Sequence, residues 1–337
     1  MRALSFWCAA AALLAGLGTA NAAGPLIVYV SPNPIGVNDF LKLGKAGTES
    51  IAKELGGESK VFESNDPTTQ RQNLEAAVKD GAKIVVAIGF EFTDMLPDVA
   101  AAHPDTKFLL VDSCPFAKMK PNIYCSVFRE YEASFLTGAE AALTSKAGKV
   151  GAIGALDIPF LHRYTDGFIE GAKHVKPDIT VAATLWVGGN NPFSDPARGQ
   201  ERAAAMVADN VDRVLAAGAG SNGGIFKAME DLAGAQEFGV DVNQCPQAPG
   251  AVMDNIEKKT DVAVELAVKG IAAGSQQPIT ALGLKEGGMA LTGLGDNVKA
   301  SQCGIADYPD AIAKVKEIRD QIVSGALNID DPMMAKT

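Results

Sequence analysis

Basic side chains and histidine are both scarce in this chain. Acidic residues outnumber basic ones, 40 to 30, and no cluster of Lys and Arg occurs, which argues against a nucleic-acid-binding surface. The three histidines, His103, His162 and His174, do not have the spacing of metal ligands. A G-x-S-x-G nucleophile turn and a P-loop lysine are absent as well. The sequence therefore gives little support for catalysis, and we expect no metal ion and no cofactor.

Long apolar runs are missing too, except at the start of the chain. The first 22 residues, MRALSFWCAAAALLAGLGTANA, combine an early arginine, an apolar core and an A-x-A cleavage site that ends at Ala22. This is the pattern of a secretory signal peptide, and its core is short for a membrane span. We expect cleavage after Ala22 and a soluble mature protein in the periplasm.

Cysteine is nearly as rare as histidine. Four cysteines follow the signal segment, and an even number in an oxidising compartment favours disulfides. None has C-x-x-C spacing, so a zinc or redox site is improbable. Three pairings are possible, and buried free thiols remain an alternative. Cys114 and Cys125 flank one short loop and form the preferred pair, which would leave Cys245 with Cys303.

The chain is rich in alternating strand-like and helix-like segments. A first series ends with a helical pattern at 130–145, and the same alternation restarts at Lys149. Two such halves predict an α/β protein of two doubly wound lobes, each with a parallel sheet and right-handed crossovers. Strands of the first half are predicted at 26–31, 60–65, 84–89, 108–113 and 123–128.

Carboxylates stand at the ends of predicted strands in both halves. Asp112 follows the apolar run Phe108–Val111, and Asp241 ends the strand 237–241. Ligands of doubly wound sheets bind outside the carboxyl ends of the strands, so a ligand held between the two lobes is the natural arrangement. We expect both acids to face that ligand, and helix capping is the alternative.

A glycine-rich loop, GAGSNGG at 218–224, opens a later helix. Its glycines fit the G-x-G-x-x-G spacing of dinucleotide-binding loops, but that spacing alone is a weak signal, and nicotinamide cofactors are uncommon outside the cell. We interpret Gly220 as a backbone contact to a ligand, with tight packing as the alternative.

Several stretches occur in the order found in one known family: AIGFEFTDMLPDVAAAHPDTKFLLVDS, EYEASFLTGAEAAL, GKVGAIGALDIP, AAGAGSNGGIFKAMED and FGVDVNQ. In them the chain resembles the basic-membrane-protein (PnrA-like) family, the substrate-binding proteins of bacterial ABC importers. The resemblance runs from about residue 24 to 325. It implies a type I periplasmic-binding fold, in which two Rossmann-like lobes joined by a hinge of three crossovers close on a small ligand.

The resemblance also implies where the lobes divide, with crossings near residues 144, 258 and 305. The N-terminal lobe would comprise 24–144 and about 259–305, and the C-terminal lobe about 145–258 and about 306–325. A helix is predicted at 255–274. The tail at 326–337 is expected to be disordered or weakly packed.

Ligand-contacting residues follow from the resemblance position by position. Many family members bind purine nucleosides, and others take nucleobases or riboflavin. The family stacks an aromatic ring of the first helix on the base, which corresponds to Phe40, and places an acid after the fourth strand, which corresponds to Asp112. Its acid and lysine for the ribose hydroxyls correspond to Asp241 and Lys258, and Trp186 lies near a further aromatic position.

Three positions depart from the family pattern. The Thr-Asp pair usual after the first strand is Ser31-Pro32, the Asn after the stacking Phe is Leu41, and the second stacking Phe is Leu215. The sugar end of the pocket is thus retained and the base end altered. A different base-like or glycosylated ligand is therefore left open.

The sequence as a whole predicts a periplasmic substrate-binding protein. It would close on a nucleoside-like solute and deliver it to an ABC transporter permease at the inner membrane, without acting as an enzyme. Two other functions stay open: an exported α/β enzyme acting on nucleosides, with Asp112 or Asp241 as acid–base, and a ligand-sensing partner of a membrane receptor. Saturable binding without turnover separates the first function from the enzyme.

Overall fold

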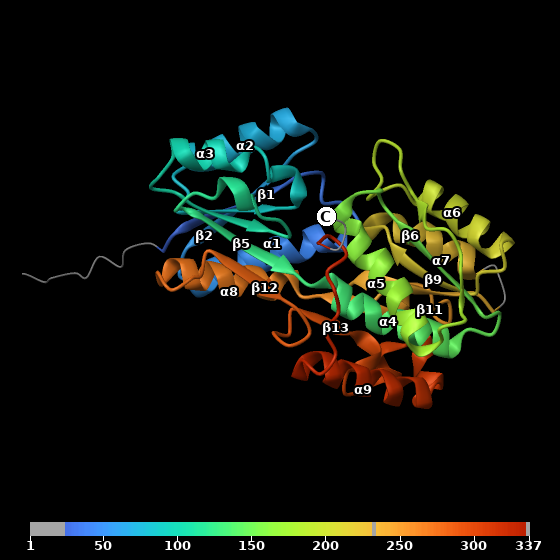
Figure 1. The fold of residues 1–337 in the computed structure, drawn as a ribbon. Coiled ribbons are helices and arrows are strands. Elements are labelled where there is room, and N and C mark those ends of the chain that lie inside the picture. Colours follow the sequence, from blue (N-terminus) through green and yellow to red (C-terminus); the bar gives the residue numbers. More distant parts are fainter. Residues whose placement is uncertain (1–23, 231–233, 335–337) are drawn as a thin grey trace, which may run out of the picture.

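The chain folds into two α/β lobes that lie side by side (Figure 1). The computed structural model describes residues 24–230 and 234–334. The predicted signal peptide, with its cleavage after Ala22, lies outside the described residues. Each lobe has a mainly parallel sheet flanked by helices, so the predicted doubly wound α/β architecture is confirmed.

The first lobe is built on a parallel sheet with the strand order β12-β5-β4-β3-β1-β2. Its strands are β1 (Leu26–Ser31), β2 (Glu58–Glu63), β3 (Ile84–Ile88), β4 (Lys107–Val111), β5 (Ile123–Phe128) and β12 (Ile279–Leu282). Its helices are α1 (Asp39–Glu54), α2 (Pro67–Lys79), α3 (Leu96–Ala102) and α8 (Thr260–Ala272). Side chains alternate along β1, so Ile27 and Tyr29 join the apolar cluster that includes α1 and α8, whereas Val28 and Val30 join the cluster of α2 and α3.

The second lobe has the strand order β13-β11-β10-β9-β6-β7, with β8 also paired to β6 and β13 running antiparallel to β11. Its strands are β6 (Lys149–Gly154), β7 (Thr180–Val181), β8 (Leu185–Trp186), β9 (Arg213–Ala217), β10 (Gln236–Asp241), β11 (Val252–Lys258) and β13 (Met289–Leu291). Its helices are α4 (Glu130–Thr144), α5 (Pro159–Val175), α6 (Pro196–Ala208), α7 (Asn222–Glu230) and α9 (Pro309–Ser324). Helix α4 packs against α5 and α9, and α6 packs against α7.

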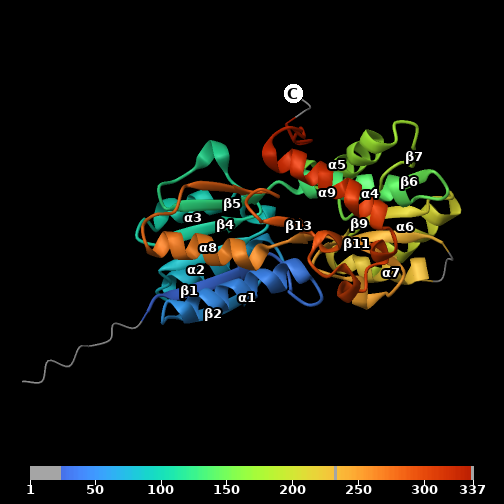
Figure 2. The same cartoon turned by 90° about the horizontal axis from the view of Figure 1, so that it is seen from below.

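The described chain passes between the lobes at three places near the waist of the molecule (Figure 2). The first passage lies between Phe128, which ends β5, and Glu130, which begins α4. The second follows Lys258 at the end of β11, and the third joins β12 to β13. The first and third passages thus come earlier in the chain than the crossings expected near residues 144 and 305.

Helix α4 belongs to the second lobe because it approaches α5 very closely. A Cβ atom at Gly138 would lie 1.9 Å from the carbonyl oxygen of Phe168, and one at Gly171 would lie 1.8 Å from that of Phe135. Only glycine permits this approach. The contact joins segments far apart in sequence, so alternation of strands and helices could not reveal it. The helix expected at 255–274 also differs: its first residues extend β11, and the helix α8 begins at Thr260.

Two disulfides form as predicted, Cys114–Cys125 in the first lobe and Cys245–Cys303 in the second. Each lies within one lobe, so neither restricts the movement of one lobe relative to the other. Across the described part of the chain, no helix combines the length and the apolar character needed to cross a membrane.

The second lobe buries two carboxyl groups close to each other. Glu140 on α4 and Asp254 on β11 are both fully buried, and no ion pair reaches either of them within residues 24–230 and 234–334. Burial, together with repulsion from Asp254, raises the pKa of Glu140 well above its usual range. Burial likewise raises the pKa of Asp254 to about 7. At least one of these groups therefore stays protonated near neutral pH.

This pair should make the free energy of unfolding fall as the pH rises. In the unfolded chain both groups ionise near about pH 4, whereas in the fold they retain protons to higher pH, so their stabilising contribution is complete below about pH 4 and is lost as the pH rises through the folded pKa values. Glu140→Gln should reduce the decline between about pH 5 and pH 7 by about 1.4 kcal/mol per pH unit. Urea unfolding at several pH values measures the slope. Glu317→Gln, on the exposed face of α9, is the control, and equal slopes in the wild type and Glu140→Gln would contradict the prediction.

Candidate ligand-binding site

A cavity lies between the lobes, at the carboxyl ends of both sheets. The space in it that a water-sized sphere can occupy is about 70 Å³, well below the usual range for small-molecule sites, so the lobes must separate to admit a ligand of that size. In the first lobe the strand order reverses between β1 and β3, and in the second between β6 and β9. Residues that follow all four strands line the cavity, so the switch points of the two sheets face the same space. The lining residues include Pro32, Phe40, Phe90, Glu91 and Asp112 from the first lobe and Phe160, Tyr164, Phe193, Asp241 and Lys258 from the second.

Lys258 is the charged centre of the site. It is the last residue of β11, is fully buried, and does not lie on a helix as expected. Its Nζ atom donates to Oδ1 of Asp112 from the first lobe and lies 2.9 Å from Oε1 of Glu130 at the start of α4. The ammonium group of Lys258, in the second lobe, thus connects the carboxylate of Asp112 in the first lobe with that of Glu130 at the first passage.

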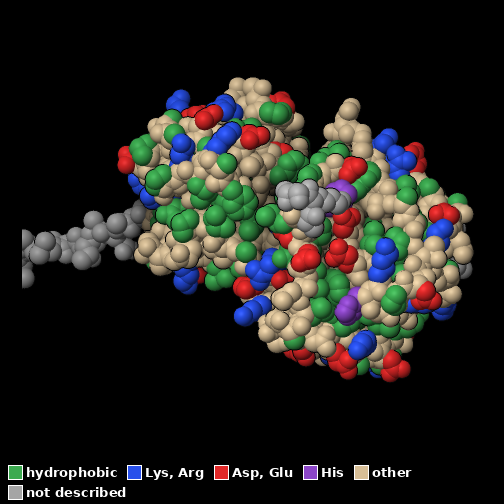
Figure 3. Space-filling model, in the orientation of Figure 1, with side chains coloured by type: hydrophobic (Ala, Val, Ile, Leu, Met, Phe, Trp, Pro, Cys, Tyr) green, Lys and Arg blue, Asp and Glu red, His purple; other side chains and the backbone are tan. Residues whose placement is uncertain are grey.

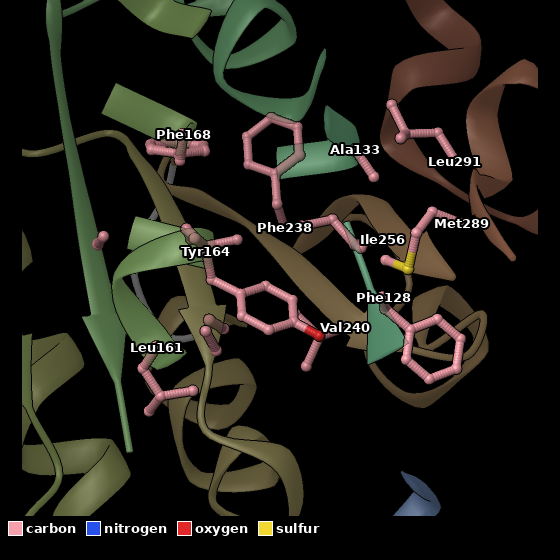
Figure 4. Close-up of a cluster of buried hydrophobic side chains, with 14 of the residues drawn as sticks. Phe128, Ala133, Leu161, Tyr164, Phe168, Phe238, Val240, Ile256, Met289 and Leu291 are labelled. Carbon is pink, nitrogen blue, oxygen red and sulfur yellow. The ribbon is translucent and has the colours of Figure 1, made fainter. Parts of the chain in front are cut away.

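Four aromatic rings surround the same ammonium group. The Nζ atom lies 5.1 Å from the ring centre of Phe40 and 4.8 Å from that of Phe128. It lies 5.1 Å from Phe160 and 5.8 Å from Tyr164. In Figure 4, Tyr164 has its hydroxyl group beside Val240, within the layer of buried side chains that also holds Phe128. The ring faces attract the cation, which partly offsets its loss of water. Phe40, predicted to stack on a ligand, is therefore in the cavity and faces Lys258.

The two predicted carboxylates share an unusual backbone conformation. Asp112 directly follows β4 with a φ of 76°, and Asp241 ends β10 with a φ of 73°. Positive φ is uncommon for residues other than glycine, although aspartate tolerates it better than most. Both residues line the cavity. The matched geometry in the two lobes indicates that each sheet end is shaped to present an acid to the gap.

Burial sets the charge state of these acids. It raises the pKa of Asp112 to about 7 and that of Asp241 to about 6, while Lys258 opposes the rise in both cases. Burial alone would lower the pKa of Lys258, but Asp112 and Glu130 outweigh it and raise that pKa well above its usual range. The lysine therefore stays charged, and Asp241 is mostly ionised near neutral pH and can accept hydrogen bonds from a ligand.

The charged cluster continues from the cavity to the C-terminal segment. Glu130 Oε2 lies 3.4 Å from Nη1 of Arg163, which also donates to the carbonyl oxygen of Phe128 at 3.2 Å. Arg163 donates through Nε and Nη2 to Asp331 at 2.9 and 2.5 Å. Charges thus alternate along Asp112, Lys258, Glu130, Arg163 and Asp331.

This contact corrects the expectation for the tail as far as residue 334, and residues 335–337 lie outside the described residues. Leu327 and Ile329 pack against the apolar core, Pro332 is buried, and Asp331 is fixed by Arg163. The segment after α9 runs back to the junction between the lobes (Figure 1), and acidic side chains gather near that junction on the face seen in Figure 3. The composition of this segment suggested weak packing. The arginine that fixes it lies 168 residues earlier in the chain, so a local pattern could not show the contact.

Replacing Asp331 tests this attachment. Asp331→Asn should lower the free energy of unfolding by about 1–3 kcal/mol, because a charge-assisted pair is lost and Arg163 keeps a weaker partner. It should also expose the segment after α9 to proteases. Urea unfolding and limited proteolysis followed by mass spectrometry measure both effects. Asp330→Asn changes the exposed neighbour and should behave like the wild type; if the two variants behave alike, the tail is not held by Asp331.

Two predicted site residues are not among those that line the cavity. Trp186 packs inside the second lobe, with its ring 5.4 Å from that of His162 and against Gly154, where a Cβ atom would come within 2.3 Å of it. Gly220 lies in a short 3-10 helix, and its neighbour Ala219 contributes to the lining instead. A Cβ atom at Gly220 would lie 3.0 Å from Val37 of the first lobe, so this glycine serves close packing between the lobes.

The three departures from the family pattern have different positions. Pro32 and Leu41 line the cavity, as the resemblance implied. Leu215 lies in the middle of β9, fully buried, and is not a lining residue. The aromatic surface of the second lobe comes from other positions, Phe160 at the start of α5 and Phe193 in the loop before α6.

Sequence reasoning missed several lining residues. Phe90 and Glu91 directly follow β3, and Phe160 follows β6 closely, so the rule that ligands bind at strand ends could have found them. Phe193 had no such signal, because it lies in a long loop between β8 and α6. Glu130 was missed because its helix, α4, was predicted in the first lobe and lies in the second.

Two parallel-sheet lobes, joined by three passages and with a cavity between them, form the type I periplasmic-binding fold. Comparison with known families agrees: residues 27–324 match the family described as ABC transporter substrate-binding protein PnrA-like. The chain belongs to this family of ABC transporter substrate-binding proteins.

Individual relatives are similar over most of their length. The chain is 29% identical to the ABC transporter nucleoside-binding protein BmpA of Lactococcus lactis subsp. cremoris, over 95% of each chain. It is 28% identical to basic membrane protein A of Borreliella burgdorferi, over 74% of this chain and 73% of that protein. Among solved structures, an ABC transporter solute-binding protein from Aeropyrum pernix K1 superposes with a TM-score of 0.78 at 24% identity, covering 91% of this chain and 94% of that one.

Proposed function

We propose that the protein binds a nucleoside-like solute between its lobes in the periplasm and delivers it to the permease of an ABC importer. The observation that carries this proposal is the composition of the cavity, in which the neighbouring aromatic rings Phe90, Phe160 and Phe193 adjoin a cluster of buried acids with a lysine. A nucleoside has the same division, because its base is planar and its sugar carries hydroxyl groups. The nucleoside-binding relative supports the same ligand class.

Asp241 is the residue best placed to receive the sugar. It is buried and lines the cavity, and no hydrogen bond to its carboxylate occurs among the described residues. A buried carboxylate without donors is unfavourable, so donors from a ligand would relieve it. Vicinal hydroxyl groups supply two such donors. Lys258 lies close enough to affect the charge of Asp241 and could donate to a hydroxyl oxygen.

The ring end of the cavity suits a planar base. Phe90 of the first lobe lies 6.5 Å from Phe160 and 6.3 Å from Phe193, both of the second lobe. A flat ring held between two others needs about 7 Å between their centres, because each face contact takes about 3.5 Å. These ring pairs are tilted by 32° and 50°, so a small separation of the lobes together with a rotation of the rings would admit a base, and stacking on it would draw the lobes together. Such stacking contributes roughly 1–3 kcal/mol per base.

Calorimetry on the mature protein tests the proposal directly. Titration with nucleosides, nucleobases, flavins and sugars should give saturable, one-to-one binding for nucleosides. The ligand recovered afterwards should be chemically intact by chromatography, since the site is proposed to hold and release it. Absence of binding to every nucleoside would refute the proposal, and release of free base and sugar would favour an exported enzyme instead.

The contribution of Asp241 gives a second, quantitative test. Asp241→Ala should weaken nucleoside binding by about 2–4 kcal/mol, because two buried charge-assisted hydrogen bonds are lost. Asp178→Ala removes an exposed carboxylate of the same lobe outside the cavity and should leave affinity unchanged. Thermal unfolding checks that both variants are folded. Unchanged affinity in Asp241→Ala would show that the sugar is bound elsewhere.

A further inference from the structure

Glu91 lines the cavity near the aromatic ring of Phe90, and it takes no part in the charged cluster around Lys258. It follows Phe90 at the end of β3, beside the point where the strand order of the first lobe reverses. Its carboxylate folds back over Gly89, where a Cβ atom would come within 2.4 Å of Oε2. Gly89 has a φ of 102°, so glycine is needed at this position both for the backbone and for the space that the carboxylate occupies.

The carboxylate of Glu91 has little to neutralise it. Among the described residues no ion pair reaches it, and its side-chain partner is the Nδ2 group of Asn33, at 3.4 Å. That amide comes from the end of β1, the strand next to β3 in the sheet. Its neighbours in the lining are largely apolar, including Pro32 and Phe90. A partly buried acid in such surroundings can still accept hydrogen bonds from a ligand.

We propose that Glu91 selects the ligand's ring by accepting hydrogen bonds from N–H groups on its edge. The preferred ligands are then amino-substituted nitrogen heterocycles, and rings that lack the amino group bind more weakly. Asn33 is a positioning residue that holds the carboxylate toward the cavity. This inference rests on the proposed nucleoside function, because it states which protein group binds the edge of the base that would stack near Phe90.

The position of Glu91 relative to the other acids supports this division of roles. Asp112 directly follows β4 and is paired with Lys258, whereas Glu91 follows the adjacent strand β3 and has no such partner among the described residues. Asp241 faces the cavity from the second lobe. A ligand with hydroxyl groups at Asp241 and Lys258 and its ring beside Phe160 would therefore extend toward Phe90 and Glu91, since Phe160 contacts both the lysine and Phe90.

Two matched ligand pairs test the proposal by calorimetry at pH 8. Adenosine is compared with purine riboside, which lacks the 6-amino group, and guanosine with inosine, which lacks the 2-amino group. Burial raises the pKa of Glu91 to about 7, so the carboxylate is largely ionised at this pH. In the wild type, at least one amino-bearing ligand should bind roughly 10- to 100-fold more tightly than its partner, the range expected for hydrogen bonds to a charged group.

Glu91→Gln should reduce that ratio to below about threefold, because the amide presents its own N–H group and no charge. Asn33→Ala keeps the acid but removes its orienting amide, and should reduce the ratio by a smaller factor. Asp94→Asn changes an exposed acid three residues away in the same segment and should keep the wild-type ratio. Thermal unfolding checks that each variant is folded. If Glu91→Gln does not fold, Asn33→Ala still tests the proposal.

The outcomes separate this inference from the function on which it rests. If the wild type binds no nucleoside, both fail. If it binds nucleosides without an amino-group preference, or if Glu91→Gln keeps the preference, the role of Glu91 is refuted while the proposed function stands. A loss of preference in Glu91→Gln, with Asp94→Asn unchanged, establishes Glu91 as a specificity-determining residue.

Discussion

The arrangement of the two lobes depends on keeping the ammonium group of Lys258 charged and paired away from water. A buried lysine without partners would lose its proton, yet here a carboxylate from each side and four rings surround it. Asp112 is supplied by the first lobe and Lys258 by the second, so the pair exists only while the lobes are close. Removal of either partner would leave an uncompensated buried charge, so each lobe depends on the other for the pairing of this group.

The passages between the lobes are connected to one another, which determines how the cavity can open. Arg129, in the first passage, bonds to Glu132, to Glu286 and to the carbonyl oxygen of Ala281, which places it against the third. The amide of Lys259, in the second, donates to Gly288 of the third at 2.9 Å. Since the three segments bond to each other, they form one unit about which the lobes can rotate as rigid bodies. Each disulfide lies within a lobe and stiffens that lobe without limiting the rotation.

The sequence predicted the architecture well, because alternation of apolar runs and helical patterns is a local property. It predicted Asp112 and Asp241 at strand ends, and the structure places them there. The resemblance pointed to Phe40 and Lys258, which also line the cavity. The failures concern long-range contacts. Helix α4 joined the second lobe through the glycine contacts at Gly138, and Asp331 found Arg163 across most of the chain. Trp186 has suitable chemistry, but it is half-buried within the second lobe with its ring beside that of His162, and Leu215 lies in the core, placements that a local pattern does not show.

The polar end and the ring end of the cavity differ in how freely they can change. Lys258, Asp112, Glu130 and Arg163 share charges, so a substitution at one of them disturbs the others, and the tail beyond them as well. At the ring end, Phe90 and Phe193 contact each other through their rings, and the side chain of Glu91 has a long hydrogen bond from Asn33 and no ion pair among the described residues. Residues there can be exchanged without removing a buried partner. The departures from the family pattern that line the cavity are Pro32 and Leu41, both apolar, whereas Asp112, Asp241 and Lys258 keep the residue types that the resemblance implied, so the difference from the family pattern lies among the apolar contacts and not among the charged ones.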